Sequence, residues 1–197
     1  MQHRLFVVRL RDDVALPEAT DHWRRAHGAL FARTPGLRGY LQNRPVDPTG
    51  WVCSETLFDD RRAETEAFRS TYYTDVVAPD EARFLDRDSV RTAVVVDQRV
   101  EHGRIARFRA VLPGTEPGEV AGAGAGVQVY RLNRPLVPGT PAVVTFVWDD
   151  DPEVVSAVTR RRGGNGFASE PRVAALAGGG WPWADGLERL CGDKSIC

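Results

Sequence analysis

The sequence predicts an α+β fold made of two tandem βαββαβ units, the second of which is degenerate. Three observations support this prediction. Apolar strands and amphipathic helices alternate in that order through residues 1–98, short motifs recur ninety residues further along, and residues 103–190 keep the strands but leave little room for a first helix.

The elements of the first unit follow from apolar periodicity and from Pro and Gly signals. Pro17 suits the first turn of a helix, and the Thr-Pro-Gly sequence at 34–36 ends that helix after Arg33. A later helix is expected to break at Pro79. The expected ranges are a strand at 5–10, a helix at 17–33, strands at 37–44 and 51–58, a helix at 62–77, a helical turn at 80–86 and a strand at 90–96. This order describes the ferredoxin-like arrangement, in which two helices cover one face of a four-stranded antiparallel sheet.

The second unit is inferred from repetition. The sequence Tyr-Leu-Gln-Asn-Arg-Pro at 40–45 returns as Tyr-Arg-Leu-Asn-Arg-Pro at 130–135, and Phe-Asp-Asp at 58–60 returns as Trp-Asp-Asp at 148–150. Two matches at one offset predict a second copy. Its expected elements are strands at 104–112, 127–135 and 143–148, a helix at 151–162 that resumes at 172–177, and a short strand or turn at 187–190. Only a Gly- and Ala-rich segment at 113–126 separates its first two strands, so the counterpart of the first helix is shortened or missing.

A single unit of this kind covers only one face of its sheet, and the other face needs a partner. Two copies in one chain can supply each other's missing layer, sheet against sheet. We therefore expect an intrachain pseudo-dimeric α/β barrel, either monomeric or assembled into a homodimer, with residues 191–197 as a flexible tail.

Composition excludes several classes of protein. The 197 residues are 42% hydrophobic and 27% charged with a net charge of −1, which is typical of an ordinary globular protein, and nucleic acid is not expected as a partner. The cysteines Cys53, Cys191 and Cys197 lack metal-ligand spacing, and their odd number argues against a secreted disulfide framework. No signal peptide or membrane-spanning run is recognised. The expected location is the cytoplasm, with no membrane partner.

The helix at 17–33 carries the sharpest chemical feature of the sequence, a histidine that faces inward. At α-helical spacing the apolar face contains Ala19, Trp23, Ala26, His27, Leu30 and Thr34, whereas Arg24, Arg25, Gly28 and Ala32 point elsewhere. A histidine on an apolar face is more often a satisfied core residue than a catalytic one. His22 lies at the edge of this face, where a boundary or exposed position is the simpler interpretation.

Four short motifs follow one another through the first unit. They are Trp23-x3-His27, Pro35-Gly36-Leu37-x2-Tyr40-x-Gln42-Asn43, Glu55-x2-Phe58-Asp59 and Phe84-x-Asp86. Their order and spacing resemble the EthD-like branch of the dimeric α/β-barrel superfamily. The resemblance implies a barrel of two ferredoxin-like units with a pocket between each sheet and its helices. It also implies relatives that include cofactor-free monooxygenases, cyclases and dehydratases of aromatic polyketides, lactone isomerases and haem-handling enzymes.

If the pocket lies between helix and sheet, as the resemblance implies, His27 lines it and can act as a general acid and base near neutral pH. Tyr72, on the same helix stripe as Phe68, is preferred over Tyr73 as an acid, and Asp86 could orient the imidazole. The aromatic walls that bind substrate are expected to be Trp23, Tyr40, Trp51, Phe68 and Phe84.

The function favoured at this point is a cofactor-free tailoring enzyme for a small aromatic polyketide. It would be a dehydratase or cyclase in which His27 removes a proton beside a carbonyl and returns one to a leaving hydroxyl. One alternative is a cofactor-independent monooxygenase of a phenolic polyketide, and another is a non-catalytic protein that binds a reactive aromatic intermediate. Haem ligation by His27 is a weaker alternative. No metal site is expected, because His22 and His27 are five residues apart and diverge on a helix.

Overall fold

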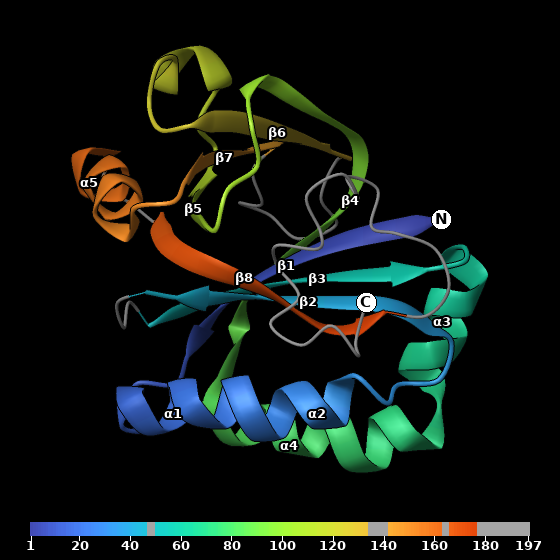
Figure 1. Cartoon of the computed structure of the whole chain (residues 1–197). Helices are drawn as coiled ribbons and strands as arrows, with labels where there is room; N and C mark the ends of the chain where they lie inside the picture. The colour runs from blue at the N-terminus through green and yellow to red at the C-terminus, as the bar shows by residue number, and fades with distance from the viewer. Residues whose placement is uncertain (47–49, 134–141, 163–165, 177–197) are drawn as a thin grey trace.

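Antiparallel pairing closes the strands of this protein into a barrel, as the computed structural model shows (Figure 1). The structure describes residues 1–46, 50–133, 142–162 and 166–176. The strands are β1 (Gln2–Leu10), β2 (Leu37–Pro45), β3 (Trp51–Phe58), β4 (Leu85–Gly103), β5 (Phe108–Pro113), β6 (Gly126–Leu132), β7 (Val143–Asp149) and β8 (Phe167–Leu176). Around the barrel they follow the order β1-β3-β2-β8-β5-β7-β6-β4. The predicted α+β class is confirmed.

Helical segments cover the outside of the barrel. They are α1 (Leu16–His22), the π turn η1 (Trp23–His27), α2 (Gly28–Phe31), α3 (Arg61–Arg69), the π turn η2 (Tyr73–Val77), α4 (Ala78–Phe84), the 3₁₀ turn η3 (Pro117–Val120) and α5 (Pro152–Arg162). Figure 1 shows α1, α2 and α4 together on one side, beneath β1 to β3, and α5 on the opposite side near β5 and β7. The segment between β5 and β6 contains a 3₁₀ turn instead of a full helix, in agreement with the expected shortening.

The strands of the two halves follow the same order. In the first half the order is β4-β1-β3-β2, and in the second it is β8-β5-β7-β6, with β2–β8 and β4–β6 pairs joining the halves. Strand β4 pairs with β1 near its beginning and with β6 near its end. The predicted boundary at residues 98–103 therefore falls inside one long strand, and the division into two units stays a prediction.

The repeated motifs do not place their side chains alike. Tyr40 on β2 points outward, into a cluster beneath the helices with Phe31 and Val77, whereas Tyr130 on β6 points into the barrel. Neighbouring residues on a strand face opposite sides, so a slip of one residue exchanges the two faces. Strands β2 and β6 are thus equivalent in sheet order, but Tyr40 and Tyr130, which led us to pair the motifs, are not equivalent in direction.

The barrel interior holds a buried ion pair that links the halves. Arg109 on β5 donates to Glu55 on β3, and its Nε donates to the Asn43 side chain at 2.7 Å. The Tyr130 hydroxyl donates to Glu55 at 3.0 Å, and His3 Nε2 lies 3.0 Å from the same carboxylate. Burial alone would raise the pKa of Glu55, but the Arg109 charge and the hydrogen bonds from His3 and Arg109 lower it to about 2.

Two of the predicted helical features are wrong. Pro79 does not end a helix, because it lies in the first turn of α4, which follows the π turn η2 without a break. The interruption lies at Ser70, whose extended ψ of 148° ends α3. The helix expected to resume at 172–177 is part of β8, which fills the space between β2 and β5 and so closes the barrel.

Three further expectations lie partly or wholly beyond this description. The strand or turn at 187–190 and the tail at 191–197 are outside the described residues, and so is the end of the strand expected at 127–135. Among the helices described, none combines the length and the apolar character that crossing a membrane requires.

Candidate active site

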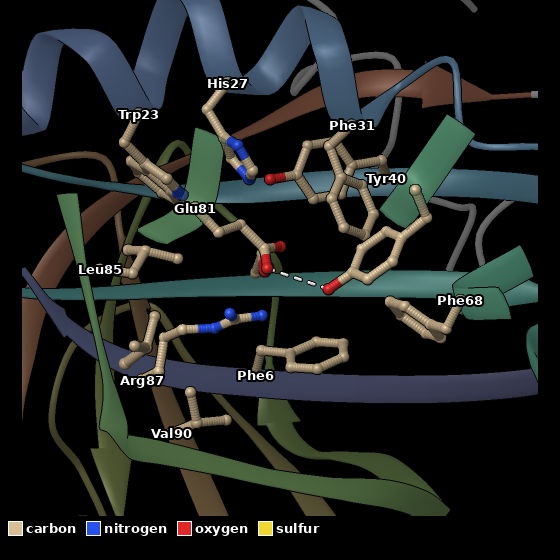
Figure 2. Close-up of a pocket in the computed structure, with 13 residues that line it drawn as sticks. Phe6, Trp23, His27, Phe31, Tyr40, Phe68, Glu81, Leu85, Arg87 and Val90 are labelled. Atoms are coloured by element: carbon tan, nitrogen blue, oxygen red, sulfur yellow. Dashed lines mark hydrogen bonds between the residues drawn. The ribbon is translucent and has the colours of Figure 1, made fainter. Parts of the chain in front are cut away.

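A cavity of about 320 Å³ lies between the helices and the sheet of the first half. Its walls come from β1 to β4 and from the helices that cover this face of the sheet. The lining residues are Phe6, Val8, Trp23, His27, Phe31, Tyr40, Ser54, Phe68, Tyr73, Glu81, Leu85, Arg87 and Val90. Figure 2 shows Phe31, Tyr40 and Phe68 grouped toward one end, Trp23 toward the other, and the side chains of Glu81 and Arg87 between them, facing the interior. The size is within the range of pockets that enclose small organic ligands.

A π turn points His27 into this cavity. In η1 the Gly28 N–H donates to the Trp23 carbonyl five residues back, and the Gln42 side chain donates to the same carbonyl at 2.7 Å. Gly28 makes room for this insertion, because a Cβ there would lie only 2.9 Å from Gln42 Nε2. The wider turn places Trp23, His27 and Phe31 on one face at a constant spacing of four residues, which an ideal α-helix would gradually rotate apart.

Those contacts correct the predicted helix face. Gly28, expected to point elsewhere, is buried against Gln42, and Ala26, expected inside, is exposed. Phe31, which the α-helical pattern left out, lies in the wall of the cavity. A wheel drawn at 100° per residue assumes a regular helix and cannot represent an inserted residue.

Asp80 holds His27 in place. Its Oδ2 lies 3.0 Å from His27 Nδ1, and its Oδ1 lies 2.8 Å from His22 Nε2. Burial alone would raise the pKa of Asp80, but hydrogen bonds from His27 and His22 lower it overall. An ionised carboxylate only accepts, so His27 carries its proton on Nδ1 and keeps Nε2 as a free base in the neutral ring. This is the geometry of a carboxylate-oriented general base.

The next residue, Glu81, has the opposite environment. It lines the cavity and accepts a hydrogen bond from the Tyr73 hydroxyl at 2.9 Å, drawn as the dashed line in Figure 2. Burial raises the pKa of Glu81 despite the nearby charges of His27 and Arg87 and the bond from Tyr73. Adjacent carboxyl groups with oppositely shifted pKa values are suited to different roles, because the lowered pKa of Asp80 favours its anion and the raised pKa of Glu81 favours its protonated form.

Tyr40 provides a second polar group near the base. Figure 2 shows its hydroxyl end and the His27 imidazole directed toward one another. Burial raises the pKa of Tyr40, although the side chains of Gln42 and Ser54 act in the opposite direction. A neutral phenol in this position can hydrogen-bond to a substrate oxygen.

Four of the predicted site residues lie in the cavity wall: His27, Trp23, Tyr40 and Phe68. The other four do not line it, and the structure shows why for each.

The side chains of Tyr72 and Trp51 point away from the cavity, because each lies on a face of its helix or strand that does not line it. The break at Ser70 shifts the helical phase, so Tyr73 faces the cavity while the Tyr72 hydroxyl donates to the Leu30 carbonyl at 2.9 Å. On β3, Trp51 packs against the barrel interior and Ser54 lines the cavity. Strand alternation alone could have excluded Trp51.

Phe84 and Asp86 lie outside the cavity wall. Phe84 is buried edge-on to the rings of His27 and His22, at centroid distances of 5.1 and 5.0 Å, so it supports the pair from behind. Asp86 accepts from the Asp88 backbone N–H at 3.2 Å, a local turn contact. The partner expected for His27 at Asp86 is instead Asp80, one helical segment earlier in the chain.

Sequence reasoning missed Asp80, Glu81 and Tyr73. Asp80 and His27 are 53 residues apart, and no local pattern reports such a contact. The adjacent Asp-Glu pair after Pro79 was visible as a helical turn, but its partners were not. Within the described part of the chain, no cluster of three or more His, Cys, Asp or Glu side chains could hold a metal ion.

Comparison with known proteins was made on sequence and on structure. Residues 11–88 match the family model of the EthD domain. Curated proteins give no significant match. One solved structure, an anthrone oxidase-like protein, is 14% identical with a TM-score of 0.58, covering 90% of this chain and 96% of that one.

Two further solved structures carry provisional enzyme names. A monooxygenase of Fusobacterium nucleatum is 9% identical with a TM-score of 0.51, covering 91% of this chain and 95% of that one. A chlorite dismutase is 12% identical with a TM-score of 0.50, covering 88% and 96%. At these identities the likeness is one of fold, and it extends over both halves of the chain. The family resemblance expected from the sequence motifs is confirmed.

Proposed function

We propose that this chain, which carries an EthD domain in residues 11–88, is a cofactor-independent oxygenase of a phenolic aromatic compound. The observation that carries the proposal is the His27–Asp80 pair, whose free Nε2 faces a cavity walled by aromatic rings. The names of two structural neighbours, an anthrone oxidase-like protein and a monooxygenase, agree with this chemistry.

In the proposed reaction the substrate supplies all the electrons. His27 Nε2 removes a proton from an activated methylene group, and the resulting carbanion adds to O₂ and forms a C–O bond. The imidazolium returns its proton to the peroxide anion. Loss of the second C–H proton, with cleavage of the O–O bond, then gives a ketone and water. The methylene carbon is oxidised by four electrons and O₂ is reduced by four, so no external reductant is required.

The residues around the base fit these steps. Rings such as Phe31 and Phe68 can stack on a flat substrate, and the buried site strengthens hydrogen bonds to an anionic oxygen. Tyr40, as a neutral phenol, can donate such a bond. The apolar walls also admit O₂, which is itself apolar.

Turnover of 1,8-dihydroxyanthrone tests the proposal. We expect O₂ uptake in a one-to-one ratio with anthraquinone formation, above the uncatalysed rate and absent under argon. His27→Ala should lower the enzymatic rate by about 10²- to 10⁴-fold, because a general base typically contributes that much. Arg99→Ala, an exposed arginine on β4 that pairs with Glu101, is the matched control. Full activity in His27→Ala would contradict the proposal.

A dehydratase or cyclase is the second candidate, and Glu81 is the observation that favours it. A protonated Glu81 can give its proton to a leaving hydroxyl while His27 removes a proton beside a carbonyl. The product would be lighter by one water and would form without O₂. Tight binding with no chemical change would instead indicate a binding protein, and a Soret band in the purified protein would indicate haem.

The shared strand order supports a proposal about architecture. We infer that the chain is an intrachain pseudo-dimer in which the first half keeps the site and the second is a reduced copy. In the second half the corresponding layer is filled with small aliphatic side chains. One site per chain is therefore expected, which the stoichiometry of ligand binding would show.

A further inference from the structure

Arg87 occupies an unusual position in the cavity. It lies near the beginning of β4 and lines the cavity, yet the residue as a whole is exposed. Figure 2 shows its side chain extending from the strand so that the guanidinium lies between Glu81 and Phe6. Its end of the cavity is therefore the end that opens to solvent.

The other ionisable groups of the site already have hydrogen-bond partners within the protein. His27 is bonded to Asp80, and Glu81 accepts from Tyr73. In contrast, Arg87 takes part in no hydrogen bond or ion pair within the part of the chain that the structure describes. The positive charge of Arg87 acts on groups in the cavity. It lowers the pKa values of Tyr73 and Glu81, although burial raises both pKa values overall.

Neighbouring arginines show that such groups are usually paired in this protein. Arg83 lies 3.9 Å from Asp80, and Arg91 donates to the Val90 carbonyl at 3.1 Å. Arg4 forms an ion pair with Glu64. A guanidinium that faces a pocket without a partner leaves planar, directional donors available to a ligand.

We propose that Arg87 is an anion-binding subsite and that the ligand is an aromatic acid, whose carboxylate or ionised phenol binds the guanidinium. The rings of this ligand pack against Phe6 and Phe68, and its reactive position lies toward the buried His27. This inference rests on the proposed function for the direction of the reactive position. The binding of the anion itself does not depend on it.

The geometry accounts for both affinity and orientation. Aromatic walls alone would bind a flat molecule in several orientations, because stacking does not distinguish one edge from another. A single cation at the open end fixes the charged edge there. The opposite edge is then directed to the closed end, where the orienting carboxylate of Asp80 holds the base.

Binding of two isosteric probes tests the subsite. Naphthalene-2-carboxylate and naphthalene-2-carboxamide share the same ring system and differ in charge. Measured by calorimetry, the wild type should prefer the carboxylate by about tenfold or more, since a hydrogen bond between two charged groups is stronger than one to a neutral amide. Arg87→Gln should remove the preference without weakening carboxamide binding. Arg87→Glu should reverse the preference.

Controls separate this result from nonspecific charge and from folding. Arg99→Gln changes the net charge equally on the same strand and should keep the wild-type preference. Because Arg87 is exposed, Arg87→Gln and Arg87→Glu should keep the circular dichroism spectrum and unfolding midpoint of the wild type. Arg87→Lys should retain part of the preference, because it keeps the charge and loses the planar fork.

The outcomes distinguish the subsite from the proposed reaction. A carboxylate preference that survives in Arg87→Gln, or no preference in the wild type, overturns the subsite whether or not oxygen is consumed. An Arg87-dependent preference supports the subsite. If that preference is found in a protein that consumes no oxygen, the subsite stands and the proposed oxygenase fails.

Discussion

The two halves of the barrel follow one strand order and differ in the layer beneath their helices. In the first half, large rings such as Phe31, Phe68 and Tyr73 hold the helices away from the sheet and leave a cavity. In the second half, Val129 and Val155 belong to a cluster of small aliphatic side chains that packs β5 to β7 against α5 and η3. The same strand order therefore carries two different layers: an aromatic-walled cavity in the first half, and in the second half a packed aliphatic layer with a pocket at its edge beside η3 and α5.

A second contrast concerns two buried polar pairs, one within the first half and one that joins the two halves. The His27–Asp80 pair borders a cavity and keeps one ring nitrogen free. The Glu55–Arg109 pair lies in the barrel interior and does not line that cavity, and its atoms bond to side chains from both halves. We therefore propose that the first pair serves chemistry and that the second holds the halves in register.

The largest effect is expected from breaking the interior pair. Arg109→Met should lower the free energy of unfolding by about 3–5 kcal/mol, because it leaves a buried carboxylate uncompensated. The double variant Arg109→Met/Glu55→Met should recover most of this loss, since a well-packed apolar pair can replace a buried ion pair. Chemical denaturation measures both. A loss below about 1 kcal/mol in the single variant would show that the pair does not hold the halves together.

Acid should weaken the same region. The pKa of Glu55 is lowered from an ordinary value of 4.5 to about 2. Its contribution to stability, about 3 kcal/mol, is therefore fully present above pH 4.5 and is lost as the pH falls toward 2. Unfolding measured across this range should show the loss in the wild type, and the double variant should lack this component. An identical acid profile in both proteins would contradict the assignment.

Small-to-large substitutions should show that the layer between helices and sheet is packed more tightly in the second half than in the first. Val129→Phe in the packed second half should cost about 1–3 kcal/mol through overpacking. Val90→Phe adds the same ring beside the cavity of the first half, so its cost in unfolding free energy should be smaller, while naphthalene-2-carboxylate binding is lost. Thermal unfolding and calorimetry give the two readouts. Equal destabilisation by both substitutions would mean that the first half is as tightly packed as the second.

The smallest effect is expected at His22. Its side chain is 26% exposed and holds the far side of Asp80, so it acts on His27 only through that carboxylate. His22→Ala should lower turnover by about fivefold, corresponding to about 1 kcal/mol for one hydrogen bond. His22→Gln, which keeps a donor, should restore most of the rate. A change in substrate affinity without a change in turnover would argue for a different role.

Much of the first half follows from its sequence. Local periodicity predicts the strands at 37–44 and 51–58 and the inward direction of His27. The family resemblance adds the pocket, and with it the aromatic wall at Trp23, Tyr40 and Phe68. The errors lie where regular spacing fails, as at the π turn of η1 and the break at Ser70. There one inserted or non-helical residue shifts the direction of every side chain that follows.

The sequence by itself determined the α+β class, the order of elements in the first half and the inward direction of His27. Only the tertiary structure decided which carboxylate orients His27, which tyrosine faces the cavity, and that residues 172–176 form the strand that closes the barrel. Periodicity reports the environment of a residue relative to its own helix or strand. The identity of a partner 53 residues away depends on how several elements pack at once, and no local pattern encodes that distance.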